Sequence, residues 1–124
     1  MPSVVRALRG ATTVEEDTAE HIAERVADLV RTLFDRNGLA PDDVVSMLFS
    51  ATPDLRSTFP PTAARLALGL DDVPLMTCQE IDVVGALPRC IRVMVHVYTD
   101  RPRAEMRHVF LEGARALRPD LAEA

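Results

Sequence analysis

Residues 17–38 read DTAEHIAERVADLVRTLFDRNG, and this stretch decides the fold class. Its apolar residues recur at spacings of three and four and form one stripe on a helix: Ile22, Val26, Leu29, Val30, Leu33 and Phe34. Asp17 or Thr18 can cap the start, with Glu20 in capping-box register after Asp17, and Asn37–Gly38 supplies a left-handed stop. We therefore predict one long helix whose apolar stripe packs against a core.

Segments on both sides of this helix have the length and composition of β-strands. Residues 3–9 (SVVRALR) are rich in Val and Leu and end at a glycine, Gly10. Residues 44–50 (VVSMLFS) are almost continuously apolar, which is typical of a strand covered on both faces or placed at a subunit contact. Further strands are predicted at residues 73–81, 91–99 and around 107–111.

Alternation in the longest of these strands separates two faces. Val93, Val95 and Val97 lie on one face, and Met94, His96 and Tyr98 on the other. A short helix is predicted between the second and third strands, from Pro60–Pro61 to Leu68, because proline is tolerated in a first turn and Gly69 can end the helix.

The order of these elements predicts an α+β fold: a mixed five-stranded sheet covered by one long helix and one short helix. One long helix cannot cover such a sheet on both faces, and the chain has only four Phe, one Tyr and no Trp. We therefore expect a homo-oligomer to supply part of the core. Residues 1–124 are expected to form a single domain, in which residues 115–124, with little apolar material, form a mobile C-terminal tail.

Composition narrows the classes of partner. The net charge is −5, which argues against nucleic acid as a ligand. The sequence contains neither a signal peptide nor a run of the roughly 20 apolar residues that a membrane helix needs, so we expect a cytoplasmic protein without a membrane partner. The two cysteines, Cys78 and Cys90, form neither a CxxC motif nor a disulfide-rich pattern and are expected to be reduced.

Residues that could hold a metal or act as a nucleophile are scattered. The three histidines, His21, His96 and His108, fall in different elements, without a second ligand at the spacing of zinc sites. The glycines form no phosphate-binding loop. Cys90 with His96 or His108 would make a nucleophilic pair, but no flanking motif supports it. We predict neither a metal nor a cofactor, and a cysteine-dependent hydrolase is kept only as an alternative.

Arginine usage is the most unusual feature of the sequence. All fourteen basic residues are arginine. Codon bias in a GC-rich genome explains that choice but not the positions: Arg9, Arg92 and Arg107 lie at predicted strand ends, as does Glu80. Such arginines either extend outward from edge strands or converge into a cleft that binds anions, a task that suits the planar guanidinium.

Six segments in collinear order resemble the monofunctional chorismate mutases of the AroH type, over a span from about Arg6 to Leu121. They are RGATTV (residues 9–14), ATPDL (51–55), QEIDV (79–83), CIRV (90–93), RHV (107–109) and LRPDL (117–121). The resemblance implies a homotrimeric pseudo-barrel with active sites between adjacent subunits. It implies the pericyclic Claisen rearrangement of chorismate to prephenate, on the route to phenylalanine and tyrosine, without a cofactor or covalent intermediate.

The same resemblance implies roles for individual residues. Arg92 would meet the ether oxygen of the breaking bond, Glu80 would accept a hydrogen bond from the ring hydroxyl, and Arg9 would bind a carboxylate. The substrate-binding residues would be Phe59, Pro61, Thr62 and Arg65 from the adjacent subunit, together with Leu75, Met76, Thr77, Phe110, Leu117 and Arg118. Arg118 would help to close the tail over the pocket.

Two positions depart from the family pattern. Thr77 stands where the family often has a cysteine, and Cys78, one position later, is expected to point to the other face of its strand. Phe110 replaces the tyrosine of an Arg-His-Val-Tyr motif, so we expect weaker binding or a modest loss of rate. The alternative function is a non-catalytic trimeric metabolite-binding module, which would need the arginines but not a matched glutamate.

Overall fold

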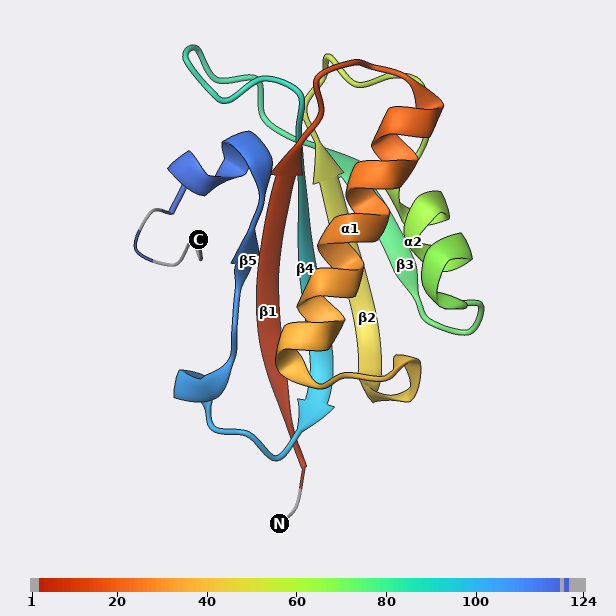
Figure 1. Ribbon diagram of the computed structural model, residues 1–124, viewed down its shortest axis with the longest axis vertical. Helices are drawn as coiled ribbons and strands as arrows, with labels where there is room; N and C mark the ends of the chain where they lie inside the picture. Colours follow the sequence, from red (N-terminus) through yellow and green to blue (C-terminus); the bar gives the residue numbers. More distant parts are fainter. Residues whose placement is uncertain (1–2, 119, 121–124) are drawn as a thin grey trace.

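Helix α1 (Ala19–Asn37) lies across one face of a five-stranded sheet in the computed structural model, which describes residues 3–118 and residue 120 (Figure 1). In spatial order the strands are β3 (Leu75–Gln79), β2 (Val44–Ala51), β4 (Cys90–Thr99), β1 (Val4–Thr13) and β5 (Val109–Phe110). β4 pairs antiparallel with β1 and β2, whereas β3 and β5 each join the sheet through a parallel pairing. The predicted mixed sheet with two helices is confirmed.

The ends of α1 are set by its caps. Thr18 is the N-cap, and its side chain accepts a hydrogen bond from the backbone N–H of His21 at 3.2 Å. Gly38 ends the helix in the left-handed conformation, with φ 61°. Asp17 takes no part in the capping box proposed from the sequence; its carboxylate instead binds the loop that precedes α2 (Pro60–Leu68).

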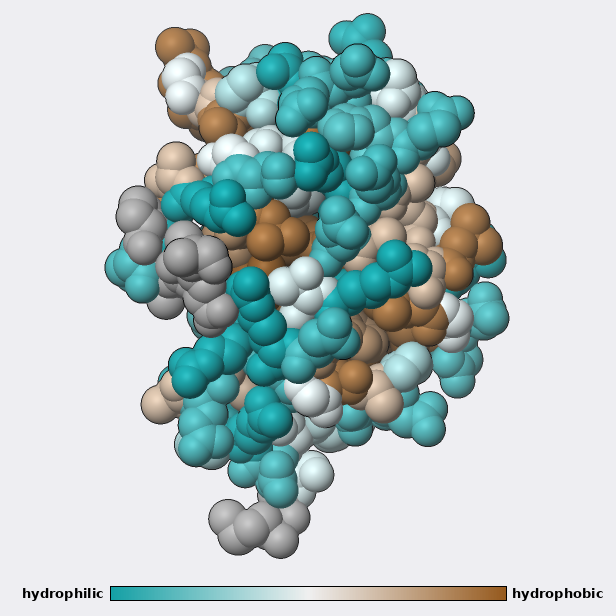
Figure 2. Space-filling model, viewed as in Figure 1, coloured by the Kyte–Doolittle hydropathy of each residue, from teal (hydrophilic) through white to brown (hydrophobic). Residues whose placement is uncertain are grey.

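The core lies between the apolar stripe of α1 and the sheet, with α2 packed beside α1 and against β2 and β3. Leu29, Leu33 and Phe49 are fully buried in it. Gly10 lets β1 approach the helix closely, because a Cβ atom there would lie 2.8 Å from Cδ1 of Leu33. Polar residues gather over the outer side of α1, and an apolar patch projects at the upper left where the β3–β4 loop lies (Figure 2).

The strand bounds differ from the predicted ones, most of all in β1, β3 and β5. β1 runs on through Gly10 to Thr13, because Gly10 pairs with Val93 on β4 and with Val109 on β5. Arg9 therefore lies inside a strand and not at its end. By contrast, β3 and β5 are shorter than predicted, so Glu80 follows β3 and Arg107 precedes β5.

The sheet face turned away from α1 is open in the described chain. On β2, Met47 and Phe49 are buried while Leu48 is 41% exposed, so the single chain covers this strand on one face only. The same open face carries further exposed apolar residues: Val5, Met76, Met94 and Tyr98. Among the described residues, no helix combines the length and apolarity needed to cross a bilayer.

The C-terminal segment follows β5 through a 3₁₀ turn at Glu112–Ala116. Gly113 N–H donates to Thr13 Oγ1 at 2.9 Å, and Arg25 on α1 forms an ion pair with Glu112 at 3.0 Å. These contacts fix the residues just before the predicted tail, which begins at residue 115. Residues 119 and 121–124 of that tail lie outside the described residues, so its mobility stays a prediction, as does the single-domain assignment of residues 1–124.

Candidate active site

An ion pair between Arg92 and Glu80 forms the centre of the candidate site. Nε of Arg92 on β4 donates to Oε1 of Glu80, just after β3, at 2.9 Å. Ser50 Oγ on β2 donates to Oε2 of the same carboxylate at 3.0 Å. The Glu80 side chain is 15% exposed and that of Arg92 34% exposed. A donor on each oxygen holds the carboxylate in one orientation while leaving its remaining lone pairs available.

The register of the sheet explains why these residues meet. β2 lies between β3 and β4, and Ser50 pairs with Cys78 on one side and with Arg92 on the other. Glu80 N–H donates to Ala51 O at 2.9 Å, which extends the pairing by one residue. Because side chains alternate along a strand, residues in register project on the same face. That face is the open one.

Arg9 reaches this face from β1. It pairs with Met94 on β4, two positions along the strand from Arg92, so both guanidinium groups lie on the open side of the sheet. A hollow of about 340 Å³ there is lined by Arg9, Gly10, Leu48, Phe49, Ser50, Cys78, Arg92, Val93 and Met94. Two arginines set among apolar and small polar side chains suit a compact organic anion.

Strand β5 and the segment that follows it add two of the predicted residues, Phe110 and Leu117, to this end of β1. The Arg9 Cζ atom lies 5.8 Å from the centroid of the buried Phe110 ring, a cation–π contact. Phe110 packs in a small cluster with Ala11 and Ala114, and Leu117 lies against it. Phe110, which lacks the tyrosine hydroxyl, thus supports the Arg9 side chain through its ring.

Arg118 and His108 are further titratable side chains at this end. Asp120 binds the Arg118 guanidinium through both oxygens, at 3.1 and 2.9 Å. Burial lowers the pKa of His108, and the positive charges of Arg9 and Arg118 lower it further. Nδ1 of His108 accepts a hydrogen bond from the backbone N–H of Arg9 at 3.0 Å.

A second group of predicted residues lies apart from the first. Phe59 and Thr77 line another hollow, of about 570 Å³, formed by the loop after β2 and the edge strand β3. Phe59 is 68% exposed, and Pro61, Thr62 and Arg65 follow it on α2, on the helix-covered side of the sheet. Within one chain these residues do not meet Arg92.

Asp17 fixes the loop that carries Phe59. Its carboxylate accepts hydrogen bonds from the backbone N–H groups of Arg56, at 3.0 Å, and of Ser57, at 3.1 Å. Hydrogen bonds from Ser57 and Arg56 lower the pKa of Asp17 below its ordinary value. The start of α1 and the approach to α2 are thereby tied together.

Thr77 and Cys78 point to opposite faces of β3, as expected from the sequence. Cys78 shares the face of Arg92 within the chain, because it pairs with Ser50. Thr77 pairs with Phe49 and lines the second hollow. Of the neighbouring predicted residues, Leu75 packs against the main core and Met76 is 68% exposed on the open face.

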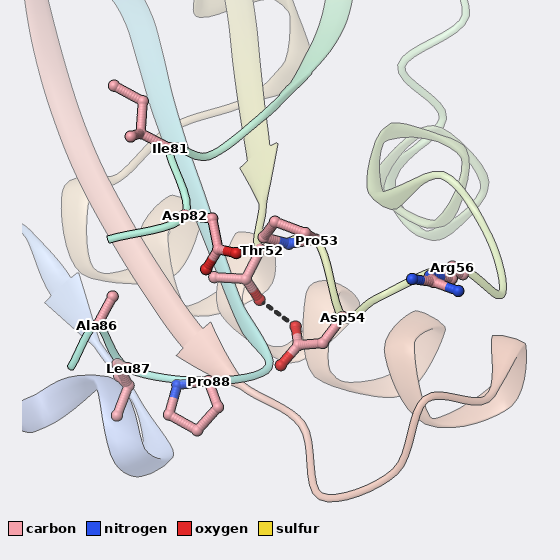
Figure 3. A pocket seen from close by; sticks show the side chains of 9 residues that line it. All are labelled: Thr52, Pro53, Asp54, Arg56, Ile81, Asp82, Ala86, Leu87 and Pro88. Carbon is pink, nitrogen blue, oxygen red and sulfur yellow. Dashed lines mark hydrogen bonds between the residues drawn. The ribbon is translucent and has the colours of Figure 1, made fainter. Parts of the chain in front are cut away.

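A third hollow, of about 320 Å³, lies between the turn after β2 and the β3–β4 loop (Figure 3). Its lining carries two carboxylates, Asp54 and Asp82, and one guanidinium, Arg56, so the excess negative charge disfavours an anion. Asp54 is already used structurally, since it accepts hydrogen bonds from Thr52 Oγ1 and, at 2.9 Å, from Arg89 N–H. This hollow is therefore not the candidate active site.

Cys90 is not placed to act as a nucleophile. The residue is fully buried, and burial together with the nearby Glu80 charge raises the pKa of its thiol to about 11. Only the thiolate is strongly nucleophilic, so a buried thiol that stays protonated at neutral pH is inert. This removes the physical basis for the Cys90 hydrolase alternative.

Fold and site together define a class of protein: an α+β chain whose open sheet face carries two arginines and an oriented carboxylate, a set of groups that suits a small anion. The chain belongs to the chorismate mutase type I family, whose match covers residues 5–121. The resemblance inferred from the sequence motifs is confirmed.

Individual relatives agree over almost the whole chain. Chorismate mutase AroH of Bacillus subtilis is 49% identical over 119 residues, covering 96% of this chain and 94% of its own length. Chorismate mutase AroH of Thermus thermophilus is 43% identical over 122 residues, covering 98% and 99%. The solved structure of chorismate mutase from Clostridium thermocellum superposes with a TM-score of 0.87 at 44% identity, covering 90% of this chain and 98% of that one.

Proposed function

We propose that this protein is a chorismate mutase, an isomerase of aromatic amino acid biosynthesis that converts chorismate to prephenate. The family match over residues 5–121 and the activity named for the relatives support the assignment. The geometric observation that carries it is the Arg92–Glu80 ion pair beside Arg9 on the open face of the sheet.

The chemistry of the reaction fits a site of fixed charges. The rearrangement breaks a C–O bond and forms a C–C bond within one molecule, so no group leaves and no nucleophile is required. The protein has to hold the enolpyruvyl group over the ring, which supplies part of the acceleration through orientation. It also has to stabilise the negative charge that develops on the ether oxygen. The absence of a cofactor stays a prediction.

Arg92 is the residue we assign to the breaking bond. Its Nε donates to Glu80, which helps to orient the guanidinium, and Arg92 lines the hollow, so its other N–H groups are the ones to reach a ligand there. These groups would donate to the ether oxygen and to a substrate carboxylate. Because charge on the ether oxygen grows as the bond breaks, the interaction is stronger in the transition state and raises kcat.

Glu80 and Arg9 would hold the ends of the substrate. The Glu80 carboxylate, oriented by Arg92 and Ser50, would accept a hydrogen bond from the ring hydroxyl. Arg9, supported by the Phe110 ring, would bind a carboxylate. Both contacts favour the compact substrate conformer in which the reacting carbons are close.

We also propose that the active site is shared between subunits of a homotrimer. Arg92 and Phe59 line different hollows of the single chain, so a site that holds both takes Phe59 from another copy. The exposed apolar residues of the open face provide the surface for the contact. Phe59, Pro61, Thr62, Arg65 and neighbouring Thr77 would then come from the adjacent subunit. Leu117 and Arg118 would cover the bound substrate.

Chorismate turnover tests the function directly. Purified protein is mixed with chorismate, and the ultraviolet absorbance of the substrate is followed against a sample without protein. We expect loss of chorismate far above the spontaneous rate, with prephenate as the product. Chorismate loss at the spontaneous rate, with chorismate still bound in calorimetry, would instead support the metabolite-binding module.

A further inference from the structure

His108 makes an unusual contact with the strand that carries Arg9. Its Nδ1 atom accepts a hydrogen bond from the backbone N–H of Arg9 at 3.0 Å. The contact joins residues that are 99 positions apart in the sequence. The proposed chemistry does not use the His108 imidazole, so its contact with Arg9 needs a separate explanation.

The contact extends a very short strand pairing. β5 pairs with β1 through Gly10 with Val109 and Ala11 with Phe110, and Leu111 N–H donates to Ala11 O at 2.9 Å. The His108 ring continues this attachment by one residue, to Arg9 itself. Phe110 lies on the same two-residue strand, and its ring lies under the Arg9 guanidinium. His108 thus ties the Arg9 backbone to the segment that supports the Arg9 side chain.

The geometry also fixes the protonation state that the contact needs. A backbone N–H can only donate, so Nδ1 must carry a lone pair and the ring proton must be on Nε2. An imidazolium would place an N–H against the Arg9 N–H and break the bond. Burial and the cations facing the ring, Arg9 from β1 and Arg118 from the C-terminal segment, favour the neutral ring.

We propose that His108 is a positioning residue for substrate binding: its neutral imidazole fixes the Arg9 backbone, and protonation of the ring releases it. The inference rests on the proposed role of Arg9 in binding a substrate carboxylate. It follows that loss of the contact raises KM for chorismate and leaves kcat nearly unchanged, because Arg92 and Glu80 are anchored on other strands.

Two substitutions of His108 distinguish the effect of losing the hydrogen-bond acceptor from the effect of losing the imidazole ring. In His108→Asn the amide oxygen can take the place of Nδ1 and does not titrate, whereas His108→Ala removes the acceptor. At pH 7.5 we expect KM to rise about three- to tenfold in His108→Ala, the range for one lost neutral hydrogen bond, and to stay within about twofold of wild type in His108→Asn. His21→Asn on α1 is the control for loss of a histidine.

The pH dependence of KM distinguishes a positioning role of His108 from a merely structural one, which would not change with pH in this way. In wild type and in His21→Asn, KM should rise as the pH falls below the ordinary histidine pKa of 6.5. In His108→Asn that rise should disappear. The charged groups facing the ring are the arginines Arg9 and Arg118, and a guanidinium stays charged across this range.

A measurement without substrate keeps the inference independent of the activity. The ¹⁵N NMR shifts of the His108 ring in the intact protein at pH 7.5 should show the Nε2–H tautomer, with the Arg9 amide protected from hydrogen exchange. A protonated Nδ1, an unprotected Arg9 amide, an unchanged KM in His108→Ala or an unchanged acid rise of KM in His108→Asn would overturn the proposal. Wild type without mutase activity would overturn the proposed function instead, and the NMR result would still decide the contact.

Discussion

Single side chains in this site gain their roles from donors on neighbouring strands. Arg92 on β4 and Ser50 on β2 each bind one oxygen of Glu80. Motif resemblance indicated Arg92, Glu80 and Arg9, because charged residues in collinear motifs stand out in the sequence. It did not indicate Ser50, since a serine in an apolar strand has no signal of its own until the register places it opposite Arg92.

Substitution of Arg92 tests the residue assigned to the breaking bond. We expect Arg92→Ala to lower kcat by at least about two to three orders of magnitude, the range for loss of a donor to developing negative charge. Arg92→Lys should also be severely impaired, because an ammonium cannot replace the planar fork that contacts Glu80 and the substrate together.

The readout for both variants is kcat from the ultraviolet assay, with light scattering to show that assembly is unchanged. Turnover near wild type in either variant would disprove the role of Arg92.

Ser50 provides a second test at the residue scale. Ser50→Ala removes the donor to Oε2 of Glu80 and should lower kcat/KM by about one to two orders of magnitude, as expected for a hydrogen bond to a charged group of about 1.5–3 kcal/mol. Ser46→Ala, on the same strand but beside His96, is the matched control. Equal kcat/KM values for the two variants would show that Ser50 does not orient Glu80.

Among the elements, the two helices and their connections decide where the second half of the site lies. Periodicity and capping predicted both helices, because a 3.6-residue stripe and terminal Gly or Pro residues are local signals. The bond from Asp17 to the loop before α2 was not predictable. It joins residues about 40 positions apart, at 3.0 Å to the N–H of Arg56 and 3.1 Å to that of Ser57.

The Asp17 carboxylate should make stability depend on pH. Because the folded state lowers its pKa below 3.8, its contribution is fully present above that value and is lost as the pH falls through the folded pKa. At pH 7 we expect Asp17→Asn to lower the Tm, and we expect the difference from wild type to shrink below pH 3.8.

Thermal unfolding across this pH range, with Asp28→Asn on the exposed side of α1 as control, measures the effect. A difference in Tm that does not vary with pH would contradict it.

At the scale of the whole molecule, the open sheet face is an apolar surface that the single chain leaves uncovered. A shortage of covering helices predicted it, and the exposed side chains of Leu48, Met76 and Tyr98 on that face agree. Monomeric proteins in water rarely expose a large contiguous apolar surface. A second and third copy would cover it and bring Phe59 of one chain toward Arg92 of another.

A charge placed on this face tests the assembly. Val5 on β1 is 51% exposed there and does not line the Arg9–Arg92 hollow. We expect Val5→Glu to convert the proposed trimer into smaller species and to reduce chorismate turnover at the same time, because burying an unpaired carboxylate is costly.

Light scattering coupled to size exclusion measures the assembly state, with Arg31→Glu on the exposed side of α1 as the control. An intact trimer with full activity in Val5→Glu would argue against this face as the interface.

The sequence by itself determined the helices, the approximate strands, the family and the three charged residues, because each is encoded in spacing, capping or collinear motifs. Only the tertiary structure decided which neutral groups accompany those charges. Cys78 instead of Thr77 shares the face of Arg92, Ser50 binds Glu80, and His108 holds the backbone of Arg9. The physical reason is register: a shift of one residue in a strand exchanges its two faces, and the pairing that sets this register joins segments far apart in the chain.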